Sequence, residues 1–309
     1  MLKKEIFLNR FPNKYERILK KKFKNINFSK RVNNTTNAII SFNRQCFDEL
    51  FESFDFDKMV NLKWIHIPFS GIEKYQKFKL IKNINFTSSR NIQSSHVAEH
   101  SIAILLSITR KIDFLSKNGI DKKFDSFPTE IKGKKVLIFG YGAVGKEIKK
   151  KITSFKPKIS IFTNKTIKKP SLVYKIYSFK KIYKAIKENQ IIFFCIPLKE
   201  ENISIISLKA LNCIKKGSVV VSVSREEIFD LVALKKIIKK KYIRFGIDFY
   251  SKDFLINNKY LTKQKNVLLT PHIAGLSDQY NDLHFKNIIF NIKNFQNNKK
   301  LKHLIFCGE

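Results

Sequence analysis

The stretch KKVLIFGYGAVGKEIKKKITSFKPKISIFTNK, residues 134–165, decides the fold of this 309-residue chain. It opens with an apolar run over 136–139, which is typical of a buried strand. Glycines follow at 140, 142 and 145, with the spacing G-x-G-x-x-G. A helical segment over 144–155 and a second apolar strand over 159–162 come next. This order of strand, glycine turn, helix and strand predicts a dinucleotide-binding unit.

Each glycine in the turn has a physical reason to be there. Gly140 allows the tight turn that leaves the strand, and Gly145 lets the helix pack closely on it. Gly142 has no Cβ, so a pyrophosphate can lie against the backbone. The N-terminus of the helix then offers unpaired N–H groups and a partial positive charge to the phosphates.

The end of the second strand predicts which dinucleotide binds. An Asp or Glu there would accept a hydrogen bond from the ribose 2′-hydroxyl of NADH and would repel a 2′-phosphate. This strand ends instead in Thr163, Asn164 and Lys165, with Lys168 nearby. The residues therefore favour NADPH over NADH. The alternative is that the two lysines only reflect a lysine-rich composition.

Length and composition indicate a globular protein with two domains. The chain has 43% hydrophobic residues, enough for two cores, and none of its apolar runs reaches the length of a membrane span. The N-terminus has neither an apolar stretch of signal-peptide length nor a small-residue cleavage site, so we expect a cytoplasmic protein that is not bound to a membrane. The four cysteines lack metal-ligand spacing, and we expect no metal site.

The formal net charge of +36 raises the possibility of a nucleic-acid partner. However, the lysines are spread over the whole chain, and Ile, Asn and Phe are abundant with them. This joint excess is typical of a general compositional bias, so we expect no nucleic-acid partner. A positive field that attracts anionic cofactors and carboxylate substrates is the expected consequence.

The segments on both sides of the glycine turn alternate between strands and helices, which predicts parallel sheets. Before the turn we expect strands over 3–8, 37–42, 62–67 and 85–88, helices over 13–23 and 47–59, and a buried helix over 97–112. After it we expect strands over 191–196, 218–224, 244–250 and 266–270, helices over 207–214 and 226–240, and a last helix with Ser277 as its N-cap and Asp278 in its first turn.

Ligands of such sheets bind at the carboxyl ends of the strands. Gly140, Pro197, Arg225, Asp248 and His272 all fall at or near such ends. Two further polar residues, Glu99 and His100, lie near the start of the buried helix. They could be catalytic, but buried polar groups at a domain junction are the more favoured interpretation.

Six motifs together resemble the D-isomer-specific 2-hydroxyacid dehydrogenase family. They are VAEH at 97–100, GYGAVG at 140–145, CIPLKEEN at 195–202, VSVSR at 221–225, GIDFY at 246–250 and TPHIAG at 270–275. The resemblance implies an α/β fold of two Rossmann-like parallel-sheet domains. A nucleotide-binding domain, 99–276, would be inserted into a flavodoxin-like substrate domain formed by 1–98 plus 277–309. It also implies a homodimer.

Reduction of a 2-keto acid needs a cation for the carboxylate and a proton donor for the forming alkoxide. Arg225 suits the first task because a guanidinium binds carboxylate bidentately. His272 suits the second because imidazole titrates near neutral pH. The resemblance adds a carboxylate partner for His272, with the spacing D-x-x-x-x-E. Counting from Asp248 places Asp253 in the position of that Glu.

The resemblance also assigns binding roles. The backbone N–H groups of Ser70 and Gly71 would bind the substrate carboxylate, Arg225 and His272 would complete the substrate site, and Asp248 would bind the nicotinamide carboxamide. The full set expected around the dinucleotide is Gly140, Gly142, Ala143, Val144, Gly145, Thr163, Asn164, Lys165, Ile196, Pro197, Val223, Ser224, Asp248, His272, Ala274 and Gly275.

The chain departs from the family pattern at several places: Asp253 replaces a Glu, Glu226 a Gly, Phe254 a Pro and Thr163 an Asp, and the region 113–133 lacks a tryptophan often found there. None removes a reacting group. The expected function is therefore reduction of a small 2-keto acid, glyoxylate or hydroxypyruvate, by hydride transfer from NAD(P)H, with NADP(H) favoured and NAD(H) possible. The alternatives are a dinucleotide-binding regulator or a weakly active relative of the same fold.

Overall fold

The computed structural model describes residues 3–53, 55–71, 75, 81, 83–119, 127–240, 243–249 and 259–306. The chain divides into two compact units: unit 1 comprises residues 1–92 and 277–309, and unit 2 comprises residues 93–276. The first boundary lies just before helix α3 (Ser94–Thr109), so this helix belongs wholly to unit 2. The sequence predicts that boundary at 98/99, which lies inside the helix.

Unit 1 is built on a six-stranded sheet in the order β13-β5-β4-β3-β1-β2. Its strands are β1 (Lys4–Asn9), β2 (Ile26–Ser29), β3 (Thr36–Ser41), β4 (Trp64–Ile67), β5 (Asn85–Ser88) and β13 (Leu304–Phe306). All pairings are parallel except that of β13 with β5. The order β2-β1-β3-β4-β5 is the flavodoxin-like order.

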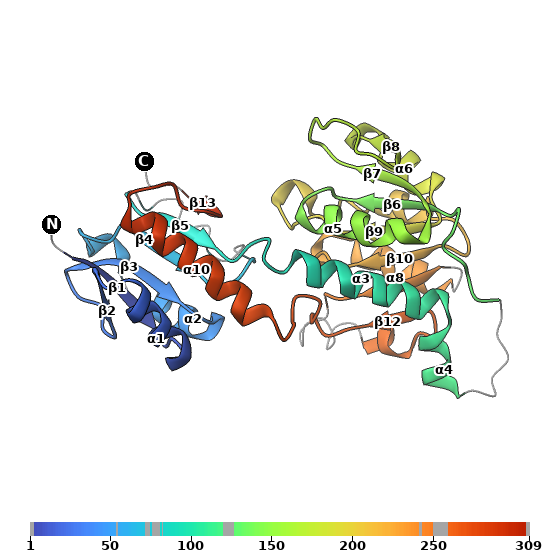
Figure 1. Ribbon diagram of the computed structural model, residues 1–309. Coiled ribbons are helices and arrows are strands. Elements are labelled where there is room, and N and C mark those ends of the chain that lie inside the picture. Colours follow the sequence, from blue (N-terminus) through green and yellow to red (C-terminus); the bar gives the residue numbers. More distant parts are fainter. Residues whose placement is uncertain are drawn as a thin grey trace. The chain divides into compact units, whose positions relative to one another are not determined.

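Alternation along these strands divides the side chains between two cores. Ile6, Ile40 and Trp64 point to one face, where α1 (Asn13–Lys22) and α10 (Tyr280–Gln296) cover them. Phe7, Ile39 and Ile65 point to the other face, toward α2 (Arg44–Ser53). Figure 1 shows α1 and α10 beside the sheet of unit 1, although they come from opposite ends of the chain.

Unit 2 is built on a seven-stranded sheet in the order β12-β11-β10-β9-β6-β7-β8, and every pairing is parallel. The strands are β6 (Lys135–Phe139), β7 (Lys158–Phe162), β8 (Val173–Tyr177), β9 (Ile191–Phe194), β10 (Val219–Ser222), β11 (Arg244–Ile247) and β12 (Val267–Leu269). This is the doubly wound Rossmann order with one extra strand. The predicted fold class is thus confirmed.

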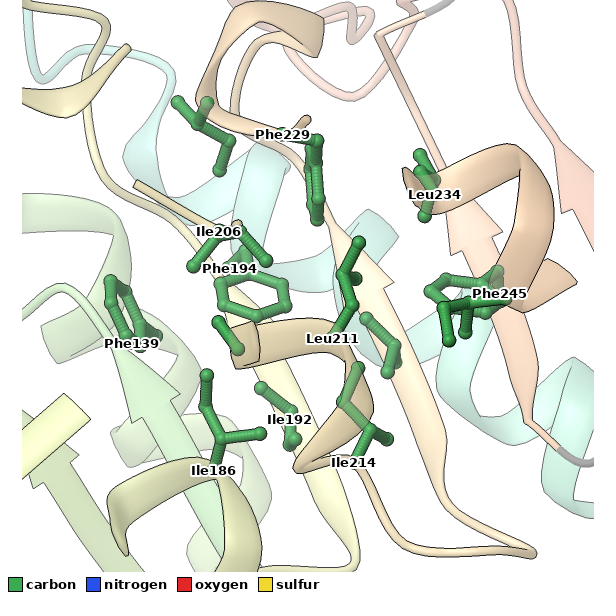
Figure 2. Packing of buried hydrophobic residues seen from close by; sticks show 14 of the residues in the cluster. Phe139, Ile186, Ile192, Phe194, Ile206, Leu211, Ile214, Phe229, Leu234 and Phe245 are labelled. Carbon is green, nitrogen blue, oxygen red and sulfur yellow. The ribbon is translucent and has the colours of Figure 1, made fainter. Parts of the chain in front are cut away.

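Helices cover both faces of this sheet because its strands are apolar on both sides. Ile138, Phe193 and Val221 pack under α3 and α5 (Ala143–Ile152). Phe139, Phe194 and Phe245 pack on the opposite face, under α6 (Ile182–Glu188), α7 (Leu208–Asn212) and α8 (Leu231–Lys239). Figure 2 shows these rings filling the second core with Ile206, Leu211 and Phe229.

Several expected elements were wrong in their bounds. The last helix begins at Tyr280 and its N-cap is Gln279, so neither Ser277 nor Asp278 has the expected place. The helix expected over 226–240 is a short 3-10 turn, Glu226–Ile228, followed by α8, whose N-cap Asp230 accepts a hydrogen bond from the amide of Ala233. Strands β2, β8 and β13 were not predicted. The helix expected over 97–112 ends at Thr109, and α4 (Ile112–Asn118) follows a left-handed residue, Lys111.

Candidate active site

The carboxyl edge of the sheet in unit 2 gathers most of the predicted site residues. Along this edge the strands run β12, β11, β10, β9, β6 and β7. Each strand is followed by a predicted segment, and these segments are, in the same order, 270–275, Asp248, 223–225, 196–197, 140–145 and 163–165. Because parallel strands lie about 4.8 Å apart, these segments form one continuous row.

The glycine turn lies between β6 and α5, where the strand order reverses, which is where open α/β sheets bind ligands. Gly140 has φ +111°, and a Cβ there would lie 2.8 Å from Cγ2 of Ile196. A Cβ at Gly145 would lie 2.0 Å from the carbonyl oxygen of Gly140. Both positions therefore need glycine for the protein's own packing.

Gly142 differs from these two glycines. A Cβ built on it would meet no described atom within 4 Å, so its need for glycine does not come from packing. Gly142 is the N-cap of α5, whose first intrahelical hydrogen bond runs from the amide of Lys146 to the carbonyl of Gly142. The amides of Ala143, Val144 and Gly145 therefore have no intrahelical acceptor. The open backbone and these donors fit a pyrophosphate.

The end of β7 carries no acidic residue. The amide of Thr163 bonds to the carbonyl of Tyr177, and its hydroxyl accepts a hydrogen bond from the amide of Lys165. Asn164, Lys165 and Lys168 are exposed. Within the described part of the chain, neither lysine has an ion-pair partner. Their charges are therefore available to a ligand.

The loop after β9 lies against the glycine turn. The amide of Cys195 bonds to the carbonyl of Phe139, and its thiol lies 3.1 Å from the carbonyl oxygen of Gly140. Burial raises the pKa of this thiol to about 12, so it stays protonated. Ile196 is half-buried and Pro197 is exposed, which leaves apolar surface beside the turn.

Arg225 follows β10 and is half-buried. Its guanidinium makes one hydrogen bond, from Nη1 to the carbonyl of Ser224 at 3.2 Å, and no carboxylate of the described residues pairs with it. Val223 is half-buried, and the buried hydroxyl of Ser224 has no hydrogen-bond partner among those residues. A partly desolvated cation without a partner is suited to an anionic ligand.

Asp248 follows β11 and is only 3% exposed. Its Oδ1 accepts hydrogen bonds from the hydroxyl of Thr270 at 2.6 Å and from the amide of Ile273 at 3.0 Å. Its Oδ2 accepts one from the amide of Ala274 at 3.0 Å. Burial alone would raise the pKa of this carboxyl, but hydrogen bonds from His100, Thr270 and the two amides outweigh it and lower the pKa.

The carboxylate of Asp248 thus holds the turn that carries His272. The backbone of His272 is left-handed, with φ 54°, and its amide bonds to the carbonyl of Thr270. His272 is exposed. Gly275 packs against Gln93, since a Cβ on it would lie 3.0 Å from Nε2 of that side chain. A non-glycine residue held in this conformation is a feature found at functional sites.

Asp253, the expected partner of His272, lies outside the described residues. In unit 1, the expected substrate loop follows β4, with Ser70 exposed and Gly71 half-buried. Two contacts to this loop were not predicted from the sequence. The Tyr280 hydroxyl donates to the carbonyl of Pro68 at 2.7 Å, and the guanidinium of Arg44 lies 4.3 Å from the Phe69 ring and 3.4 Å from the carbonyl oxygen of Gly71.

Unit 1 also contains a buried polar chain that the sequence did not predict. Nε2 of His66 lies 3.3 Å from the Ser89 hydroxyl, which lies 2.6 Å from Nδ1 of His284. His66 and His284 are fully buried and their rings stack. Burial and the nearby His284 and His303 lower the pKa of His66 well below its usual value, and burial lowers that of His284 to about 4. Both side chains are neutral at pH 7.

Comparison with known proteins places this architecture in a family. The family model for the NAD-binding domain of the D-isomer-specific 2-hydroxyacid dehydrogenases matches residues 102–274. A glyoxylate reductase of Thermofilum pendens is 27% identical over 63% of this chain and 60% of its own length. A glyoxylate/hydroxypyruvate reductase of Arabidopsis thaliana is 27% identical over 71% of this chain and 68% of its own. The chain therefore spans less than two thirds of the first of these relatives.

The solved structures agree on the fold. A D-isomer-specific 2-hydroxyacid dehydrogenase family protein from Aeromonas salmonicida aligns with a TM-score of 0.80 over 98% of this chain and 99% of its own, at 18% identity. No described helix has both the length and the apolar character that a membrane span requires. Because the family model covers more than half of the sequence, the chain belongs to the D-isomer-specific 2-hydroxyacid dehydrogenase family.

Proposed function

We propose that this protein reduces a small 2-keto acid to the D-2-hydroxy acid with NAD(P)H. The observation that carries the proposal is the row of segments along the carboxyl edge of unit 2. The segments suited to phosphate and ribose follow β6 and β7. The segments that carry Arg225, Asp248 and His272 follow β10, β11 and β12.

The residues of unit 2 fit a dinucleotide. In the proposal, Gly142 and the free amides of α5 hold the pyrophosphate, and Ile196 and Pro197 provide an apolar surface for the nicotinamide ring. Thr163, Asn164 and Lys165 hold the adenine ribose. When bound, the dinucleotide supplies a hydride to the keto carbon. We propose NADPH as the preferred form. The positive charges of Lys165 and Lys168 would attract a 2′-phosphate, and the end of β7 has no carboxylate that would repel it.

Arg225 and His272 would act on the keto acid. The guanidinium of Arg225 binds the substrate carboxylate and polarises the keto oxygen, so negative charge forms there next to a fixed cation. His272 in its protonated form then gives its proton to the alkoxide oxygen, which leaves a neutral imidazole and a hydroxyl. Asp253 is assigned as the carboxylate that favours the protonated imidazole.

The substrate class rests on the relatives and on the charge of the site. Glyoxylate and hydroxypyruvate are the proposed substrates, with the amides of Ser70 and Gly71 assigned to the carboxylate in addition to Arg225. We also propose that the protein is a homodimer in the cytoplasm, without a nucleic-acid partner. Sedimentation with and without NADPH measures the oligomeric state.

The test is a panel of 2-keto acids assayed with NADPH and with NADH, followed by the loss of reduced-nicotinamide absorbance. We expect turnover of glyoxylate or hydroxypyruvate, with a higher kcat/KM for NADPH. Tight NADPH binding without turnover of any keto acid would contradict the proposal. That outcome would favour a dinucleotide-binding regulator.

A further inference from the structure

His100 lies at the centre of the hydrogen bonds that hold the His272 turn, although it comes from a helix far away in the sequence. Nε2 of His100 is 3.0 Å from Oγ1 of Thr270 and 3.5 Å from Oδ1 of Asp248. The Thr270 hydroxyl has one hydrogen, and the 2.6 Å contact shows that it is donated to Asp248. Oγ1 can therefore only accept from His100, so Nε2 of His100 carries a hydrogen.

A close approach of α3 to β11 makes this contact possible. His100, Ile104 and Ile108 are spaced four residues apart and lie on one face of α3. A Cβ on Gly246 would lie 2.1 Å from Cγ2 of Ile104 and 3.1 Å from Cδ1 of Ile108. Gly246 and Asp248 are two residues apart and face the same side of the sheet. Glycine at 246 thus lets Ile104 sit on β11, and one helical turn earlier His100 reaches Asp248.

We propose that His100 is a positioning residue for the reaction: through Thr270 and Asp248 it fixes the turn that presents His272. The inference rests on the proposed function for its catalytic consequence, but its structural part stands separately. His100 donates to Thr270, Thr270 donates to Asp248, and Asp248 accepts the amides of Ile273 and Ala274, which directly follow His272. Of the titratable groups in the described segments, His100 is the one within ion-pair distance of Asp248.

The test compares three variants. His100→Met removes the donor and keeps an unbranched apolar side chain. His100→Gln keeps an N–H at a similar reach and serves as the rescue. Glu99→Gln is the matched control, because the neighbouring Glu99 is exposed and pairs with Lys151 at 3.6 Å, away from Asp248.

We expect His100→Met to lower kcat about 10- to 100-fold, the scale of a small misplacement of a reacting group, while the KM for NADPH stays near the wild-type value. Loss of the His100 N–H beside Asp248 should also raise the pKa of that carboxyl, so activity should be lost at a higher pH on the acid side. His100→Gln should restore both, and Glu99→Gln should leave both unchanged. The proposal would be overturned if His100→Met left both kcat and the acid side of the pH–activity profile unchanged. It would also be overturned if His100→Gln lost as much kcat as His100→Met.

A second measurement needs no turnover. Amide hydrogen exchange of Ile273 and Ala274 should be faster in His100→Met than in the wild type, and close to wild type in the other two variants. If the protein proves inactive toward keto acids, faster exchange would still support the positioning role. Unchanged exchange in His100→Met would refute that role whether or not the protein is an enzyme.

Discussion

The two units bury polar groups of opposite kinds. In unit 2 the group is a carboxylate, Asp248, kept ionised by hydrogen bonds from Thr270, Ile273 and Ala274, with Nε2 of His100 3.5 Å away. In unit 1 it is a pair of neutral imidazoles, His66 and His284, and Nε2 of His284 has no hydrogen-bond partner among the described residues. A buried charge is stable only with its partners in place, whereas a buried imidazole is stable only without its proton. The two units should therefore respond differently to pH and to substitution.

The largest effect is expected from Arg225 in unit 2, and Arg44 in unit 1 provides the matched comparison. Arg225→Lys keeps the charge but loses the planar fork, so kcat for the keto acid should fall about 10²- to 10³-fold, the scale for losing one donor to a developing oxyanion. Arg44→Lys is the matched change in unit 1, where the guanidinium lies on the Phe69 ring. It should cost about 2- to 5-fold in KM, the worth of an exposed cation–π contact. If Arg225→Lys and Arg44→Lys lost the same factor in kcat/KM in steady-state assays, the two arginines would not have the different roles assigned to them.

Acid should destabilise unit 1 before unit 2. The folded-state pKa of His284 is about 4, below its usual 6.5, so its contribution to stability is present above pH 6.5 and is lost as the pH falls toward 4. That loss is up to about 3 kcal/mol. The pKa of Asp248 is lowered from 3.8, so its contribution to stability persists between pH 6.5 and 4.

Trp64, the one tryptophan of the chain, is buried in unit 1 beside His66, so its fluorescence reports on that unit. We expect the fluorescence of Trp64 to show an acid transition between pH 6.5 and 4. His284→Phe keeps a ring in the stack with Tyr280 but has no proton to gain, so its transition should move to lower pH. Fluorescence titration of both proteins measures the shift. The same midpoint in the two proteins would mean that His284 does not cause the acid response.

Two glycines of unit 2 should separate packing from ligand binding. Gly145→Ala places a methyl 2.0 Å from the carbonyl oxygen of Gly140, so we expect a loss of about 1–3 kcal/mol in unfolding free energy. Gly142→Ala enters open space, so its thermal unfolding should stay near wild type while its affinity for NADPH falls. Denaturation and fluorescence titration measure the two quantities. Normal NADPH affinity in Gly142→Ala would rule out the pyrophosphate position.

A further prediction concerns the choice of cofactor. NADPH should be preferred about tenfold, or roughly 1.4 kcal/mol, the worth of one charge-assisted contact with the 2′-phosphate. Thr163→Asp should move the preference toward NADH because a carboxylate repels that phosphate. The ratio of kcat/KM for the two cofactors measures the shift. A wild-type preference for NADH would contradict the assignment of Thr163, Asn164 and Lys165.

The sequence could place the segments of the candidate site along the chain, because each directly follows an apolar strand. The glycine turn, Arg225 and the Asp248 and His272 segments were all placed by the strand that precedes them. It could not predict contacts between distant residues, such as His100 with Thr270 or Tyr280 with Pro68, since these depend on how helices pack on the sheets. The sequence predicted the helix over 97–112, but it did not predict the close approach of that helix to Gly246. Short strands such as β13 lack a periodic signal.

The most direct measurement follows one hydrogen atom. NADPH carrying deuterium at the transferred position of its nicotinamide ring is mixed with the protein and hydroxypyruvate, and the product is analysed by mass and chirality. The account predicts a D-2-hydroxy acid with the deuterium on C2, formed in step with cofactor oxidation, and a greatly slowed transfer in Arg225→Lys. Binding of the labelled cofactor without transfer of deuterium to any keto acid would contradict it.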